Sequence, residues 1–136
     1  MKNVAACITV FLIGVYFLHS GNVLSGEDPL TPKMPTHWKV TSDYQVPAEK
    51  VKAMSIKFGA TLRSVRNTVY DVNGKRVQLN VIVTPDNANV EKLMTKLRSM
   101  KSEEGLLQKG LIVYEFVGQN DVIPVIAEGR KHLDSM

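Results

Sequence analysis

The sequence predicts a small α+β domain that follows an export segment. Two apolar spacings alternate along the chain: every second residue, typical of half-buried strands, and every third or fourth residue, typical of helices that bury one face. Between two strand-like segments, the pair Asn73-Gly74 marks a tight turn of the kind that joins antiparallel strands. These observations predict one sheet with helices packed on it.

The first predicted elements are a strand from His37 to Gln45 and a helix from Pro47 to Gly59. Apolar and polar side chains alternate in the strand. Proline is favoured at the first position of a helix and glycine just after the last. The apolar residues of this region are Trp38, Val40 and Tyr44 in the strand and Val51, Met54 and Phe58 in the helix.

Two strands are expected beside the Asn73-Gly74 turn, from Leu62 to Asp71 and from Lys75 to Val83. Their register depends on the length of the loop. A two-residue loop pairs Arg66 with Val81 and so places charge opposite a regular apolar row.

A three-residue loop, Val72 to Gly74, shifts this pairing by one residue. It brings Val69 opposite Val77 and Val65 opposite Val81. We predict this register because it collects the apolar side chains on one face of the sheet. The outer face would then carry Arg66, Thr68, Tyr70, Arg76, Gln78 and Asn80.

The second half of the chain predicts a helix, a strand and another helix. Thr84-Pro85 suits the cap and first turn of the first helix. The strand runs from Leu111 to Val117, and Glu115 is expected to point away from the core because an unpaired buried charge is costly. Asp121 suits the cap of the last helix. The apolar stripe of the first helix is Val90, Leu93, Met94, Leu97 and Met100.

In chain order these elements give β-α-β-β-α-β, the split arrangement of ferredoxin-like folds, with an extra C-terminal helix. Two right-handed crossovers would place four strands in one antiparallel sheet, with two helices on one face. The extra helix is expected to cover a sheet edge, part of the open face, or a second subunit.

The first 25 residues resemble a signal peptide. Lys2 precedes an apolar run, Val4 to Leu18, which is shorter than the ~20 residues of a spanning helix. Cleavage is expected after Ser25, with the position after Ser20 as the second choice. In the alternative, the segment stays uncut as a short N-terminal anchor, which would be the chain's contact with a membrane. A linker rich in proline, residues 26–36, then leads to a single domain, residues 37–136.

The composition restricts the chemistry of the exported domain. The single cysteine, Cys7, lies in the predicted leader, so disulfides, thiolate catalysis and thiolate metal sites are excluded from the rest of the chain. The net charge of +4 is small and dispersed, and the outer sheet positions lack a stacking platform, so no nucleic-acid partner is predicted. No cofactor or metal is expected, since His19, His37 and His132 lie far apart in the sequence.

Two polar groups remain as candidate binding sites, and no catalytic residue is assigned. The first group is on the predicted outer sheet face, where arginine and tyrosine are typical of binding hot spots. The second follows the last strand, where carboxylate and amide groups could bind a ligand, although a turn and a helix cap explain them better. The residues are Lys39, Arg66, Tyr70 and Arg76 in the first group and Glu115, Asn120 and Asp121 in the second.

The sequence favours a non-enzymatic domain, exported to the periplasm or the cell exterior, that binds a protein partner or a second copy of itself. The outer sheet face or an edge strand would form the contact. A peptidase inhibitor or propeptide-like domain is one alternative, by analogy of topology. A small hydrolase or lyase is another, and it requires Glu115, Asp121 and His132 to converge in one pocket.

Overall fold

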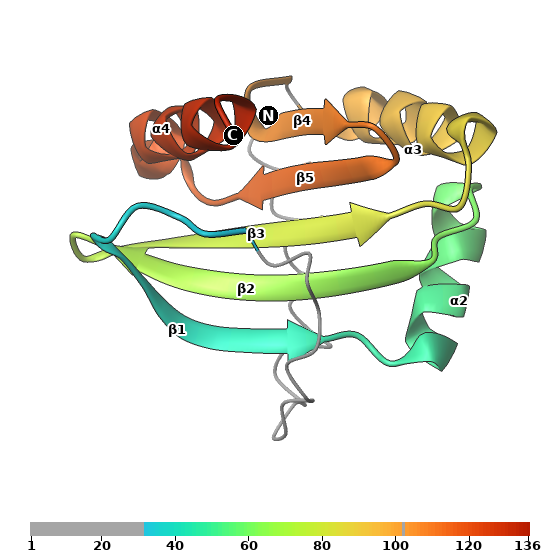
Figure 1. Ribbon diagram of the computed structural model, residues 1–136, viewed down its shortest axis with the longest axis horizontal. Coiled ribbons are helices and arrows are strands. Elements are labelled where there is room, and N and C mark those ends of the chain that lie inside the picture. Colours follow the sequence, from blue (N-terminus) through green and yellow to red (C-terminus); the bar gives the residue numbers. More distant parts are fainter. Residues whose placement is uncertain (1–31, 102) are drawn as a thin grey trace.

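The computed structural model describes residues 32–101 and 103–136, so the predicted leader, its cleavage site and most of the linker lie outside the described residues. The fold is α+β, as predicted, with five strands in one antiparallel sheet in the order β1-β2-β3-β5-β4 (Figure 1). The elements are β1 (Trp38–Gln45), α2 (Ala48–Phe58), β2 (Ser64–Val72), β3 (Lys75–Val83), α3 (Asn87–Met100), η1 (Glu103–Gly105), β4 (Leu106–Lys109), β5 (Ile112–Val117), η2 (Asn120–Val122) and α4 (Ile123–Asp134).

The β2–β3 hairpin has a two-residue loop instead of the predicted three-residue loop. Tyr70 pairs with Val77, and Arg66 pairs with Val81. Both loop residues of Asn73-Gly74 have positive φ, 55° and 86°, and this backbone matches the twist of the flanking strands. The predicted register is therefore wrong, because the turn geometry outweighs the gain from collecting valines on one face.

A fifth strand, β4, was not predicted. It has only four residues and pairs with β5 across a tight turn in which Gly110 takes a φ of 63°, a conformation that favours glycine. The chain therefore passes from α3 to the outer strand β4 and returns as β5 between β4 and β3.

The strand order also differs from the predicted four-stranded split arrangement. A split β-α-β unit leaves room for another strand between the two strands that its helix joins, whereas β1 and β2 are direct antiparallel neighbours. The chain folds back on itself here: the Val46 N–H donates to the Val65 carbonyl at 2.9 Å, just where β1 ends. The helix α2 thus links adjacent strands.

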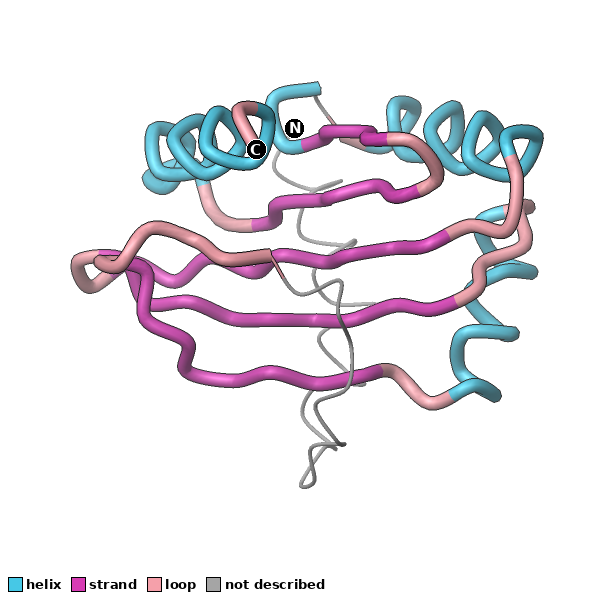
Figure 2. The backbone as a smooth tube through the Cα atoms, in the orientation of Figure 1, coloured by secondary structure: helices cyan, strands magenta, loops and turns pink. Residues whose placement is uncertain are grey.

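Helices cover both faces of the sheet. α2 and α3 lie near one end of the strands and α4 near the other end (Figure 2). The helical spacings predicted the buried residues of α2 and α3 correctly, except that Met100 is only partly buried. α4 packs on the opposite face and thus covers part of the face that was expected to be open. The core under α2 and α3 includes Tyr44, Val65, Ile82, Val113, Val51, Met54, Phe58, Val90, Leu93, Met94 and Leu97.

The core under α4 is built on aromatic rings. Trp38 meets Tyr70 and Phe116 edge to face, with ring centroids 5.2 and 6.1 Å apart. Ile126 and Leu133 of α4 are buried in the same cluster. This arrangement fixes α4 against β1, β2 and β5.

Two helices begin later than predicted. The cap of α3 is Asp86, whose carboxylate accepts the Asn89 backbone N–H at 2.9 Å, whereas the Thr84 hydroxyl donates to the Leu111 carbonyl at 2.9 Å. Asp121 lies in η2, a single 3₁₀ turn that precedes α4. Across residues 32–101 and 103–136, no helix has the length and apolarity needed to span a membrane.

Candidate functional site

The predicted outer row of basic and aromatic residues does not lie on one face. Arg66 and Tyr70 are on the face that packs against α4, and both are buried. Arg76 and Lys39 both lie opposite Asp71 in the strand register, and they are exposed on the opposite face of the sheet. The one-residue change in register separates the two pairs, because it moves the side chains of one strand to the other face relative to the neighbouring strand.

In the second predicted group, which follows the last strand, Glu115 and Asp121 lie in different surroundings. Glu115 is fully buried, and its Oε1 accepts a hydrogen bond from Asn80 Nδ2 at 3.1 Å. The expectation that Glu115 points away to solvent is wrong, since polar partners within the fold compensate its burial. Asp121 is exposed, and its Oδ2 lies 3.6 Å from Lys75 Nζ. Asn120 begins the 3₁₀ turn η2.

The three residues of the hydrolase alternative do not come together. Glu115 pairs with Asn80 and faces away from α4. His132 lies in the last turn of α4, where its Nε2 donates to the Lys33 carbonyl at 2.8 Å. Asp121 precedes the first turn of this helix, and the nine residue steps from Ile123 to His132 rise about 14 Å. The described residues offer these groups no common pocket.

The strand β1 is the open edge of the described sheet. It has a neighbour, β2, on one side only (Figure 1). The other outer strand, β4, is tied to α4: Arg130 Nε donates to the Leu106 carbonyl at 2.9 Å, and Lys109 Nζ donates to the Leu133 carbonyl at 2.8 Å. An edge with free backbone groups is a template for pairing with another chain.

The register of β1 shows which backbone groups point outward. Val46 and Val65 form a hydrogen-bonded pair, and such pairs alternate with pairs whose N–H and carbonyl groups point away from the neighbouring strand. A bulge at Thr41 inserts one extra residue into this alternation. The residues of β1 whose N–H and carbonyl groups both face outward are Val40, Asp43 and Gln45.

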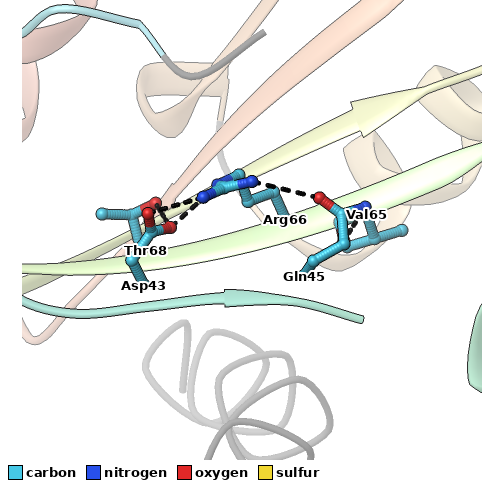
Figure 3. Close-up of polar contacts among 5 residues, drawn as sticks. All are labelled: Asp43, Gln45, Val65, Arg66 and Thr68. Atoms are coloured by element: carbon cyan, nitrogen blue, oxygen red, sulfur yellow. Dashed lines mark hydrogen bonds and ion pairs between the residues drawn. The ribbon is translucent and has the colours of Figure 1, made fainter. Parts of the chain in front are cut away.

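A buried arginine fastens β1 to β2 (Figure 3). Nε and Nη2 of Arg66 donate to the two carboxylate oxygens of Asp43 at 2.9 and 2.7 Å, and Nη1 donates to Gln45 Oε1 at 3.3 Å. The Thr68 hydroxyl donates to Asp43 at 3.0 Å, and Gln45 Nε2 donates to the Val65 carbonyl at 3.4 Å. Bidentate arginine–carboxylate pairs have a specific geometry. Two of the residues with outward backbone groups are therefore fixed through their side chains.

Tyr70 lies beside this cluster, opposite Val40. Burial raises the pKa of the Tyr70 phenol to about 12, the Asp43 charge adds to the rise, and the Arg66 charge opposes it. The phenol is therefore neutral at physiological pH. Val40 itself is 58% exposed, although it belongs to the face that carries the aromatic core.

A second polar feature, unforeseen from the sequence, crosses the opposite face of the sheet. Asn67, Asn80 and Glu115 are paired across β2, β3 and β5, and Asn67 Nδ2 donates to Asn80 Oδ1 at 2.8 Å. Lys101 Nζ lies 3.8 Å from Glu115 Oε2 and donates to the Phe116 carbonyl at 2.6 Å. Burial lowers the pKa of Lys101, and the Glu115 charge opposes this effect. We call Asn67, Asn80 and Glu115 the polar row.

The described part of the chain contains no group of three or more His, Cys, Asp or Glu residues that could hold a metal ion. In comparisons with known proteins, no family model, no curated protein and no solved structure matches the chain. The function is therefore argued from the geometry of the edge strand.

Proposed function

We propose that the protein is an exported, non-enzymatic domain that binds a polypeptide by pairing β1 with an extended segment of its partner. The observation that carries this proposal is the outward row of backbone groups at Val40, Asp43 and Gln45 on a strand with one neighbour. An added strand would satisfy these groups with main-chain hydrogen bonds, which is the mode of binding known as β-strand addition.

The hydrogen-bonded cluster of Asp43, Gln45, Arg66 and Thr68 supports the proposal, because it holds the edge strand in place before a partner binds. Asp43 and Gln45 are held to β2 by side-chain hydrogen bonds from one face of the sheet. Ordering flexible groups costs free energy on binding, and a strand that is already fixed avoids much of that cost. Their outward N–H and carbonyl groups take no part in these bonds.

The bulge in β1 does not disturb the spacing of the outward row. The extra residue, Thr41, is tied inward by its hydroxyl, which donates to the Val69 carbonyl at 3.2 Å. Val40 and Asp43 lie opposite Tyr70 and Thr68, which are two residues apart. Two residues of a regular strand span ~6.6 Å, so the outward groups keep the repeat that an ordinary partner strand requires.

Export is the second part of the proposal and is tested separately. Lys2 followed by the apolar run from Val4 to Leu18 supports it. The test is to determine the N-terminus and intact mass of the protein recovered outside the cytoplasm. A chain that begins at Gly26 is expected, whereas recovery of the whole protein from the cytosol would refute export.

Two substitutions at Val40 test the edge. Val40→Pro removes an outward N–H without removing a hydrogen bond to β2, because the lost donor faces away from that strand. Val40→Thr is the matched control, since it keeps the N–H and the branched shape. Far-UV circular dichroism should show that both variants fold.

The tagged full chain and both variants are then recovered from the exported fraction, and the amount of each co-purified protein is quantified. The wild type and Val40→Thr should retain the same bound polypeptide. Val40→Pro should lose most of it. Equal recovery with all three chains would refute the proposed function. So would a wild type that retains no polypeptide at all, neither another protein nor a co-expressed untagged copy of itself.

A further inference from the structure

We infer that the partner of β1 is a second copy of this chain, paired antiparallel about a two-fold axis between Thr41 and Ser42. This inference rests on the proposed function and names its partner. It would join two five-stranded sheets into one continuous sheet. Closed two-fold dimers, in which the same surface is used twice, are the commonest protein oligomers.

The row of outward groups along β1 is self-complementary. The Trp38 N–H is already used, because it donates to the Pro35 carbonyl at 2.9 Å. By the alternation of the ladder, the Trp38 carbonyl still faces outward. The proposed axis sets Val40 opposite Asp43 of the second copy, and Trp38 opposite Gln45 of the second copy.

Every free outward N–H then meets a carbonyl. The N–H of Val40 faces the carbonyl of Asp43 of the second copy, and the reverse bond forms as well. The N–H of Gln45 faces the carbonyl of Trp38 of the second copy. Repeated by the two-fold axis, these contacts give about six main-chain hydrogen bonds. The Trp38 N–H, which is already bonded to Pro35, is the single donor left out on each strand.

Other two-fold registers either match fewer groups or set like charges opposite each other. Because Thr41 is an extra residue, placing Asp43 opposite Gln45 moves Val40 opposite Pro47, which has no N–H and is the N-cap of α2. Placing Val40 opposite its own copy sets Asp43 opposite Trp38 and leaves Gln45 beyond the start of the partner strand, for about four bonds. Placing Asp43 opposite its own copy matches as many groups as the proposed register, but it sets two carboxylates directly opposite each other. The alignment about Thr41 and Ser42 is therefore favoured by the positions of the free donors and acceptors together with the separation of like charges.

The elements at the two ends of β1 leave room for this pairing. α2 follows β1 and packs on one face of the sheet, whereas Met34, which precedes β1, packs against the core on the other face. In the dimer, the α2 helix of one copy would lie near the start of β1 of the second copy, but across the sheet from its Met34. No like charges are set directly opposite, since Lys39 faces Tyr44 and Asp43 faces Val40.

Light scattering during size-exclusion chromatography tests the dimer. The full exported protein, its Val40→Pro variant and its Val40→Thr variant are measured from about 1 μM to 1 mM. The wild type and Val40→Thr should approach twice the chain mass as concentration rises. Val40→Pro removes two of the inter-copy bonds and should weaken association about 30-fold.

Two further measurements do not depend on how well Val40→Pro folds. Amide hydrogen exchange of the wild type should slow with rising concentration at Val40, Asp43 and Gln45. In a Cys7→Ser background, a mixture of Thr41→Cys and Ser42→Cys chains should form a disulfide between the two variants faster than either variant does alone, because the axis sets these positions opposite each other.

The outcomes separate this inference from the proposed function. A wild type that stays monomeric up to 1 mM, while it still captures a different polypeptide that Val40→Pro loses, would overturn the second copy as partner and leave edge binding intact. A dimer that Val40→Pro does not weaken would overturn the inference as well. A monomer that captures nothing would refute both.

Discussion

Gly129 in α4 should be a position at which alanine destabilises the fold, contrary to its usual effect in helices. In an exposed helix interior, replacing glycine by alanine stabilises by about 1 kcal/mol. At Gly129, a Cβ atom would lie 2.5 Å from Cη2 and 2.9 Å from Cζ2 of Trp38, and 3.0 Å from Cε1 of Phe116. The Trp38 ring cannot easily retreat, because it is 5% exposed and packed edge to face with Tyr70 and Phe116.

The size of the effect follows from two opposing terms. Adding a methyl group to a well-packed core costs about 1–3 kcal/mol, and the gain in helix propensity offsets up to about 1 kcal/mol of this. Gly129→Ala should therefore lower the free energy of unfolding by about 1–2 kcal/mol. For a domain of this size, the midpoint of thermal unfolding should fall by about 5–10 °C, measured by circular dichroism with urea titrations in parallel.

A double-mutant cycle with Trp38→Phe supplies the control. Phenylalanine lacks the two tryptophan atoms that meet the new methyl group, so Gly129→Ala should become neutral or stabilising in the Trp38→Phe background. If Gly129→Ala raises the unfolding midpoint of the wild type, or acts equally in both backgrounds, α4 does not pack on Trp38 as described.

Three other perturbations give distinct expected results. Asp43→Ala leaves the buried Arg66 guanidinium without its bidentate partner and should cost about 2–3 kcal/mol in urea unfolding, whereas an equal stability would show that the pair contributes nothing. Lys101→Met leaves the buried Glu115 carboxylate without its cation and should lower the free energy of unfolding by about 3–5 kcal/mol. Adding Glu115→Gln should recover most of this loss, and a double variant no more stable than the single one would contradict the pairing. The folded-state pKa of Tyr70 is raised to about 12 from 10.0, so its contribution to stability is complete below pH 10 and is lost as the pH rises towards 12. Tyr70→Phe should remove this slope in urea titrations from pH 9 to 12, and an unchanged slope would refute the assignment.

The parts of the fold that depend on local spacing were predictable from the sequence. Val51, Met54 and Phe58 are buried as their three- and four-residue spacing indicated. Helix burial needs one face to be apolar, and that property is visible in a single segment. The strand segments and the Asn73-Gly74 turn were likewise recognisable, because their residues favour one backbone conformation.

The parts that depend on pairing between segments were not predictable. The hairpin register was misjudged, since valines were expected to share one face while Arg66 was expected on the other. Arg66 is tolerated among apolar side chains because Asp43, which is 23 residues away, neutralises it. Glu115 is buried for a similar reason, because Lys101 and Asn80 reach it from other elements. A single sequence does not reveal such compensation.

For the candidate site too, the residue types could be recognised from the sequence, but their placement depended on pairing between strands. Arg66 and Tyr70, which the sequence singled out as binding residues of an open face, are buried beside the proposed edge. The sequence placed them in one row with Arg76, which in fact lies on the other face. An edge strand was named as a possible contact. Its identity as β1 follows from the order of the strands, which local propensities do not determine.

The polar row has a consequence for how the sheet finds its alignment. If β2 slid by one residue against β3, Asn67 would move from Asn80 into the aromatic core under α4, where its amide would have no partner. Misaligned hairpins would thus be penalised even where their valines meet well. The buried amides of Asn67 and Asn80 thus disfavour misaligned pairing of β2 and β3. Replacing both residues by valine should permit β2 to slide against β3, which the wild-type chain suppresses.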